Sequence, residues 1–216
     1  MKRRNIALAT SIGLFVSICL ANANPASAGS YLPTGSAAVP PAGFLGFCVK
    51  HLQDCIAKPQ EPASIELTDA RRRMLEAVQH DINTSITPRV DQTHTWDYST
   101  DGTGDCNKYA LSKRRDLIAM GWPRNTLLLA TATTEGGEGH LVLVARTDRG
   151  DLVLDNRVSQ VVDWSVLPYH WISVQSQQSP ARWVSILSQP ITTADASAAL
   201  RAPNPLAAAV PSVITR

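Results

Sequence analysis

The chain has 216 residues, of which 18% are charged, and its formal net charge is +2. This length is sufficient for one ordinary domain with its own hydrophobic core. The sequence has no basic stripe of the kind that binds nucleic acid or an anionic membrane surface, because the three arginines at 71–73 are better explained as the solvated face of a helix.

The N-terminal residues 1–28 have the layout of a secretory signal peptide. A basic start precedes an apolar run over 6–20, and the small residues Ala-Ser-Ala follow at 26–28. We expect cleavage after Ala28 or after Ala23. The apolar run is too short to favour a membrane anchor, and no other stretch of eighteen apolar residues occurs. The prediction is an exported, periplasmic protein without stable membrane insertion, and secretion from the cell is the alternative.

The two ends of the mature chain lack the periodicity of regular structure. Residues 29–43 are rich in Pro, Ala, Gly and Ser, which predicts an extended leader. Residues 189–216 are dominated by Ala, Pro, Ser and Thr, which predicts a disordered tail. The folded domain is therefore expected over 44–188.

Cysteine usage separates one thiol from the others. Cys19 lies in the signal peptide, and Ile18 before it disfavours a lipoprotein site. The mature chain keeps Cys48, Cys55 and Cys106, and an oxidising compartment favours pairing. Cys48 and Cys55 are close enough in sequence for a local disulfide, which would leave Cys106 free. Pairings that include Cys106 stay open, because connectivity does not follow from sequence.

Two helices are expected in the first half of the domain. The first spans 69–85, where apolar residues repeat every four positions, Thr68 can cap the start and Pro88 enforces an end. A loop over 91–105, rich in Asp, Thr and Gly, separates it from a second helix over 106–120, which stops before Gly-Trp-Pro.

Strand-like runs dominate the second half of the domain. They lie at 126–133, 140–147 and 151–155, with weaker runs at 171–175 and 183–187. The second and third flank Asp-Arg-Gly at 148–150, which is a hairpin turn signal. Helices followed by mostly antiparallel strands indicate the α+β class.

The hairpin can bring a histidine and a carboxylate together. If its turn centres near 148–149, His140 and Asp155 lie directly or diagonally across the two strands. Such side chains on one face are about 4.5 to 8 Å apart. Asp155 can then fix the tautomer of His140 and stabilise its charged form. A register slip of one residue would place the two side chains on opposite faces.

Cys106 begins the second helix, where unpaired N–H groups and the helix dipole favour the thiolate. If that helix packs near His140, the thiolate can attack a carbonyl carbon while His140 transfers the proton and Asp155 orients the imidazole. The backbone N–H of Cys106 is one candidate oxyanion donor, and the indole N–H of Trp96 is a second. The alternatives are that Cys106 is a small buried hydrophobe and that Trp96 serves packing.

Three blocks of sequence together resemble the bacterial transglutaminase-like cysteine peptidases. They are GDCNKYALSKRRDLIAMGWP at 104–123, GEGHLVLVARTDRGDLVLDN at 137–156, and the segment from Trp164 to Trp183 that contains Tyr169 and Gln-Gln-Ser at 177–179. The resemblance covers about residues 44–187. The family includes periplasmic proteases that clip surface adhesins and so control biofilm attachment.

The resemblance implies a papain-like core of the transglutaminase type, in which a nucleophile at a helix start packs on an antiparallel sheet. It carries the catalytic roles onto Cys106, His140 and Asp155. The pair in CVKHLQDC also matches a cysteine pair common in exported members, which supports a Cys48–Cys55 disulfide and a free Cys106.

One departure from the family concerns calcium. The adhesin-clipping members usually have GDCED, and the acidic residues beside the nucleophile bind calcium that activity needs. Here Asp105 is retained, but Asn107 replaces the Glu. Calcium prefers several carboxylates, so a site formed by Asp105 and Asn107 is expected to be weaker or absent. Asp97 and Asp101 can compensate, although their spacing is not that of an EF-hand, and calcium stays a candidate ligand.

These features together predict an exported cysteine endopeptidase that cleaves a periplasmic or cell-surface protein through a thioester. One alternative is protein-glutamine acyl transfer by the same three residues. Another is a catalytically silent binding module of the same fold. The sequence identifies neither the substrate nor a regulatory protein.

Overall fold

The computed structural model describes residues 30–56, 58, 61–93 and 95–187. The signal peptide and the C-terminal tail that the sequence predicts lie outside these residues. The elements in chain order are β1 (Thr34–Ala38), α1 (Ala42–Lys50), α2 (Leu52–Cys55), α3 (Asp69–Ser85), β2 (Thr87–Pro88), β3 (Thr103–Gly104), α4 (Cys106–Ala119), η1 (Arg124–Thr126), β4 (Leu127–Thr133), β5 (Gly139–Thr147), β6 (Gly150–Leu154), β7 (Val162–Asp163), η2 (Trp164–Val166), β8 (His170–Ser176) and β9 (Ser179–Ile186). No helix among the described residues has both the length and the apolar character that a membrane span requires.

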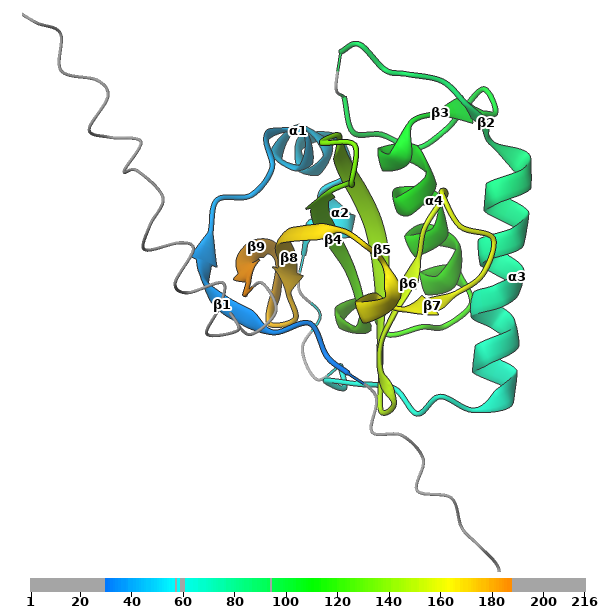
Figure 1. Ribbon diagram of the computed structural model, residues 1–216, viewed down its shortest axis with the longest axis vertical. Helices are drawn as coiled ribbons and strands as arrows, with labels where there is room; N and C mark the ends of the chain where they lie inside the picture. Colours follow the sequence, from blue (N-terminus) through cyan, green and yellow to red (C-terminus); the bar gives the residue numbers. More distant parts are fainter. Residues whose placement is uncertain (1–29, 57, 59–60, 94, 188–216) are drawn as a thin grey trace, which may run out of the picture.

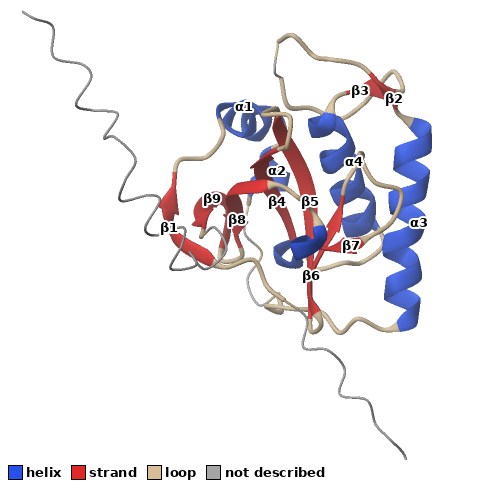
Figure 2. Ribbon diagram, viewed as in Figure 1, coloured by secondary structure: helices blue, strands red, loops and turns tan. Residues whose placement is uncertain are grey.

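A seven-stranded sheet forms the centre of the molecule, with the order β1-β9-β8-β4-β5-β6-β7. Every neighbouring pair in this sheet is antiparallel. Helix α4 packs on β5, and α3 packs on α4, as Figures 1 and 2 show. The five predicted strands correspond to β4, β5, β6, β8 and β9, and the predicted α+β class is confirmed.

Both faces of the central strands are buried, which explains why β4 has an almost uninterrupted apolar sequence. Leu127 and Leu129 belong to the core under the helices, together with Leu75 of α3. Leu128 and Ala130 belong to a second core on the other face, together with Trp164 of η2 and Trp171 of β8. The alternation of neighbouring residues between two cores fixes the register of β4, because a one-residue slip would exchange the faces.

The two predicted helices are confirmed nearly to the residue. Helix α3 begins where Thr68 caps it, with the hydroxyl accepting from the backbone N–H of Arg71 at 3.3 Å. Helix α4 starts at Cys106 and ends at Ala119. Gly121 follows with a φ of 92°, a left-handed conformation that suits the residue after a helix C-cap.

The N-terminal boundary of the domain differs from the predicted one. Residues 29–43 were expected to form a leader outside the domain, but β1 lies within them and pairs with β9 at the edge of the sheet. Helix α1 follows at once and buries Phe44 and Phe47. The strand sequence Thr-Gly-Ser-Ala-Ala carries no apolar alternation, so backbone pairing rather than a side-chain pattern places it. The short β3 likewise forms inside the predicted loop, in parallel with β2.

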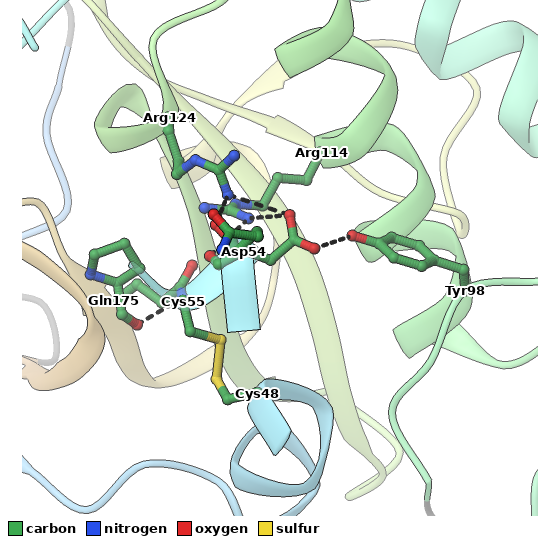
Figure 3. The surroundings of a disulfide bond; sticks show 9 residues. Cys48, Asp54, Cys55, Tyr98, Arg114, Arg124 and Gln175 are labelled. Carbon is green, nitrogen blue, oxygen red and sulfur yellow. Dashed lines mark hydrogen bonds and ion pairs between the residues drawn. A yellow bond between two sulfur atoms is a disulfide. The ribbon is translucent and has the colours of Figure 1, made fainter. Parts of the chain in front are cut away.

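The disulfide joins Cys48 of α1 to Cys55 of α2, with a Cα–Cα distance of 5.7 Å. Figure 3 shows its surroundings. Cys106 is the free cysteine of the described residues. The structure thus has the local pairing that the sequence spacing favoured.

The disulfide loop places Asp54 against two buried arginines (Figure 3). Arg124 Nη1 lies 3.2 Å from Asp54 Oδ1 and Arg114 Nη1 lies 3.9 Å from it, while Tyr98 Oη donates to Asp54 Oδ2 at 2.9 Å. Burial, together with the nearby charge of Arg124, lowers the pKa of Arg114 to about 10. The Arg114 guanidinium therefore stays charged at neutral pH, and Asp54 is the carboxylate that pairs with both arginines.

We expect the double substitution Cys48→Ser and Cys55→Ser to lower the free energy of unfolding by about 2 to 3 kcal/mol, because it frees a short closed loop. Loosening of Asp54 from the two arginines adds to this loss. Urea unfolding of both proteins measures the effect, with Cys106→Ser as the control that removes a thiol outside the disulfide. Equal stability of the double variant and the control would contradict the structural role of the loop.

Candidate active site

Asp105 fixes the point at which the helix with Cys106 begins. Its Oδ1 accepts from the backbone N–H groups of Asn107 at 3.2 Å and Lys108 at 3.4 Å. These bonds satisfy two of the N–H groups that a helix start leaves unpaired, which is the role of an N-cap aspartate. Cys106 is therefore the first residue of α4, the helix that packs on β5, and its side chain is half-buried.

His140 and Asp155 are brought together across the β5–β6 hairpin. The register pairs Leu143 with Leu154, and its continuation places Asp155 opposite Val142, so that Asp155 is diagonal to His140 on the same face. His140 Nε2 lies 2.8 Å from Asp155 Oδ1. Both side chains are almost fully buried, with exposed fractions of 5% and 0%. The predicted contact between the two residues is therefore present in the structure.

The Asp155 carboxylate has two further hydrogen-bond donors. Tyr169 Oη donates to Oδ2 at 2.5 Å, and the backbone N–H of Arg157 donates to Oδ1 at 2.9 Å. Burial alone would raise the pKa of Asp155, but His140 and these donors outweigh it and lower the pKa below its ordinary value. Asp155 is therefore held as an anion beneath the imidazole.

Two amide side chains on α3 hold the backbone at Asp155. The Gln79 Nε2 group donates to the carbonyl oxygens of Asp155 and Val158, both at 2.7 Å. The Asn83 Nδ2 group donates to the same two oxygens, both at 3.1 Å. Each NH₂ group has two hydrogens and each carbonyl oxygen accepts two bonds, so the four groups satisfy one another.

Sequence reasoning assigned no role to Tyr169, Gln79 or Asn83. Gln79 carried a weak signal, because it lies beside the buried apolar stripe of α3 and is itself fully buried. Tyr169 carried none, because it reaches Asp155 through a loop whose path does not follow from a sequence pattern.

Cys106 and His140 line the same cavity, which has a volume of about 690 Å³. The Nε2 atom of His140 is engaged by Asp155, so Nδ1 is the nitrogen that is left for the thiol. In the described residues Sγ makes one long contact that qualifies as a hydrogen bond, to Asn107 Oδ1 at 3.9 Å. The thiol and imidazole therefore lie near each other without a well-aligned bond, which is common before substrate binds.

The charge of His140 depends on both neighbours. Burial disfavours the imidazolium, but the hydrogen bond and charge of Asp155, helped by the nearby Cys106 sulfur, raise the pKa of His140 to about 9. The imidazole is thus held in its protonated form at neutral pH. A cysteine sulfur and an imidazole facing one cavity can together attack a carbonyl carbon and protonate a leaving group.

A buried lysine lies on the same helix as Cys106. Lys113 is fully buried, and its Nζ has no hydrogen-bond partner among the described residues. Burial lowers the pKa of Lys113 to about 7, and the opposing attraction comes from Asp155. The carboxylate under His140 therefore has a second, weaker electrostatic partner on α4.

Trp96, the second candidate oxyanion donor, has a packing role in the structure. Its ring makes edge contacts with Phe44 and Trp183, with centroids 6.1 and 6.3 Å apart. The backbone at Gly43 lies close to the indole, because a Cβ atom added there would be 2.5 Å from Trp96 Nε1. Trp96 also lines the cavity beside Cys106, and its role as a donor stays a prediction.

The residues suggested for calcium do not fit a calcium ion. The Oδ2 atom of Asp105 accepts from Asn107 Nδ2 at 3.0 Å, which turns the amide nitrogen, not its oxygen, toward the carboxylate. The carboxylates of Asp97 and Asp101 are each paired with a cation of the chain. Asp97 Oδ2 lies 3.0 Å from Lys50 Nζ, and Asp101 Oδ2 lies 2.9 Å from Arg89 Nη2. Within the described residues, no group of three or more His, Cys, Asp or Glu side chains is arranged to hold a metal.

We expect Tyr169→Phe to lower the free energy of unfolding by about 2 kcal/mol, because a buried carboxylate loses a charge-assisted hydrogen bond. Tyr31→Phe is the matched control, since the Tyr31 hydroxyl donates to the uncharged backbone oxygen of Thr147 at 3.0 Å. Chemical unfolding at neutral pH gives both values. The same loss in both variants would show that Tyr169 has no special relation to Asp155.

The raised pKa of His140 predicts a pH dependence of stability. A histidine whose pKa rises from 6.5 to about 9 on folding stabilises the protein fully below pH 6.5, and this contribution is lost as pH rises through 9. The loss amounts to roughly 3 kcal/mol. Unfolding free energies between pH 6.5 and 10 should show it in the wild type and not in His140→Gln. An equal decline in both proteins would contradict the assignment.

Comparison with solved structures finds LapG of Legionella pneumophila. One LapG chain is 23% identical with a TM-score of 0.46, covering 55% of this chain and 69% of its own. A structure titled as calcium-bound LapG is 20% identical with a TM-score of 0.47, covering 63% of this chain and 81% of its own. No curated protein sequence matches significantly.

The family assignment comes from a sequence model of the bacterial transglutaminase-like cysteine proteinases, BTLCP, which matches residues 34–190. The match begins at β1, which lies before the predicted domain start at residue 44. It extends over most of the chain, and the protein therefore belongs to the bacterial transglutaminase-like cysteine proteinase family.

Proposed function

We propose that the protein is an exported cysteine endopeptidase in which Cys106 is the nucleophile, His140 the acid–base residue and Asp155 the orienting carboxylate. The observation that carries the proposal is the 2.8 Å His140–Asp155 pair, which faces a cavity shared with a free cysteine at a helix start. Membership of a cysteine proteinase family supports it.

In the proposed reaction, the Cys106 thiolate attacks the scissile carbonyl carbon and His140 gives its Nδ1 proton to the leaving amine. The peptide C–N bond breaks, the new C-terminal fragment departs, and the acyl group stays on Sγ as a thioester. His140 then takes a proton from water, whose oxygen attacks the thioester carbon. The acid product leaves and the thiolate is restored, while Asp155 stays ionised throughout.

The backbone N–H of Cys106 is the proposed oxyanion donor. Asp105 caps the helix through the N–H groups of Asn107 and Lys108, so the Cys106 N–H has no partner within the described residues. A preorganised N–H group of this kind stabilises the charge that develops on the carbonyl oxygen.

The proposed location is the periplasm, and the proposed substrate is a periplasmic or cell-surface protein. The N-terminal sequence pattern supports export, and the Cys48–Cys55 bond suits an oxidising compartment. A peptide segment is a suitable substrate for the site, because the cavity is open to solvent along the ends of β4, β5 and β8.

The proposal is tested by incubating wild type and Cys106→Ala with periplasmic and surface proteins of the source organism, followed by mass spectrometry of new termini. We expect new termini with the wild type alone, and Asp155→Asn should lower their rate of appearance by roughly 10²- to 10⁴-fold. Identical termini from wild type and Cys106→Ala would refute peptidase activity.

Two further measurements separate the alternatives. Incorporation of a fluorescent primary amine into glutamine side chains, without new termini, would identify acyl transfer instead of hydrolysis. Alkylation of Cys106 by iodoacetamide tests for a silent module, because an activated thiol should react faster than a free cysteine and slow down in His140→Ala. His170→Ala is the matched control, since His170 is exposed at the start of β8.

A further inference from the structure

Lys108 and Asp91 form an ion pair beside the candidate nucleophile. Lys108 Nζ lies 3.3 Å from Asp91 Oδ2, and the exposed fractions of the two side chains are 15% and 19%. Asp91 lines the cavity together with Cys106. The pair therefore links the loop after β2 to the first turn of α4, next to the thiol.

Lys108 occupies a position that local electrostatics disfavours. It is the third residue of α4, where the positive end of the helix dipole repels a cation. A mostly buried ammonium also needs a partner that offsets its lost hydration. Its stem lies across Gly104, where an added Cβ would come within 2.6 Å of Lys108 Cβ. A glycine before the cap thus leaves room for Lys108 to reach Asp91.

Asp91 is organised to receive this charge. Its Oδ1 accepts from the backbone N–H of Thr93 at 2.9 Å and from the Thr93 hydroxyl at 2.5 Å. These bonds, with a smaller contribution from Lys108, hold the pKa of Asp91 at about 2. The Asp91 carboxylate is therefore ionised over the whole physiological pH range.

The other carboxylates of this region are also matched internally. Asn107 is buried, and its amide donates to Asp105 at 3.0 Å. The remaining two, Asp97 and Asp101, pair with Lys50 and Arg89. Acidic residues follow the cysteine in the GDCED block of adhesin-clipping relatives, whereas an amide and an ammonium follow it here. The negative charge is thus removed at Asn107 and reversed at Lys108.

We propose that Lys108 is a positioning residue whose ammonium, with the Asn107 amide, orders the loop beside Cys106, so that this protein needs no calcium to hold its nucleophile in place. This proposal rests on the proposed function only in taking Cys106 as the nucleophile. The ordering itself is a property of the fold, and it is measurable without turnover.

The first test is calcium titration of the full mature chain with and without a chelator. By linkage, a protein with no site shows a Tm shift of less than about 1 °C on addition of calcium chloride or EGTA. The rate of Cys106 alkylation should also be equal under both conditions. A rise in Tm with calcium that EGTA reverses would overturn the proposal.

The second test removes and restores the ammonium. Lys108→Met should speed hydrogen exchange of residues 91–105 and slow Cys106 alkylation by roughly tenfold, because the thiol is no longer held in place. Lys108→Arg should restore most of the protection from hydrogen exchange and most of the Cys106 alkylation rate. Lys50→Met is the matched control, because it removes the exposed Lys50–Asp97 pair of the same loop. Exchange in Lys108→Met that equals the wild type, or no rescue by arginine, would refute the positioning role.

The paired substitution Asn107→Glu and Lys108→Asp tests the charge argument directly. It restores two acidic residues after Cys106. We expect calcium to raise the Tm of this double variant and to leave the Tm of the wild type unchanged. Absence of this gain would contradict the idea that these two residues replace an ion. If these results hold while no new termini appear with wild type, the proposed peptidase function fails and the loop inference stands.

Discussion

The buried carboxylate of Asp155 is the constraint on which the rest of the structure depends. Its residue is 1% exposed, and an anion at such depth is stable only when every side of it is satisfied. His140 of β5, the tyrosine before β8 and the backbone after β6 meet this requirement, while α3 holds the carbonyl of the same residue. One anion thereby determines how three parts of the fold converge.

Ion pairs connect elements that are distant in sequence. Lys108 joins α4 to the loop after β2, and Asp54 joins the disulfide loop to arginines of α4 and η1. His140 joins the two strands of the hairpin. Each pair has one partner on or next to the helix–sheet core, so the surrounding loops inherit the rigidity of that core. This arrangement suits a site that must hold a thiol and an imidazole in fixed relation.

Features of the site that depend on local pattern were predictable from the sequence, and those that depend on chain path were not. The helix start at Cys106 followed from its capping residue, and the diagonal between His140 and Asp155 followed from a recognisable turn. The partner of Lys108 is 17 residues away through an irregular loop, and β1 has no apolar alternation to reveal it. Such contacts arise from tertiary packing, which a single sequence does not encode in any short-range period.

The pairing of β1 with β9 has a mechanical consequence. Thr34 pairs with Ile186 at the end of β9, whereas the residues before β1 are held on the other side of the sheet. There Ser30 Oγ donates to Asp163 Oδ1 at 2.7 Å, and the backbone N–H of Leu32 donates to Asp151 Oδ2 at 2.9 Å. Tension applied from the C-terminal side would begin at Ile186 and open the β1–β9 hydrogen bonds one after another, instead of shearing them together. The β5–β6 pair with the site lies further across the sheet, beyond β8 and β4. A pull on the C-terminal side would thus act first on the sheet edge far from the cavity, whereas a pull on the N-terminal side would act first on β6 and β7, next to the strand with His140.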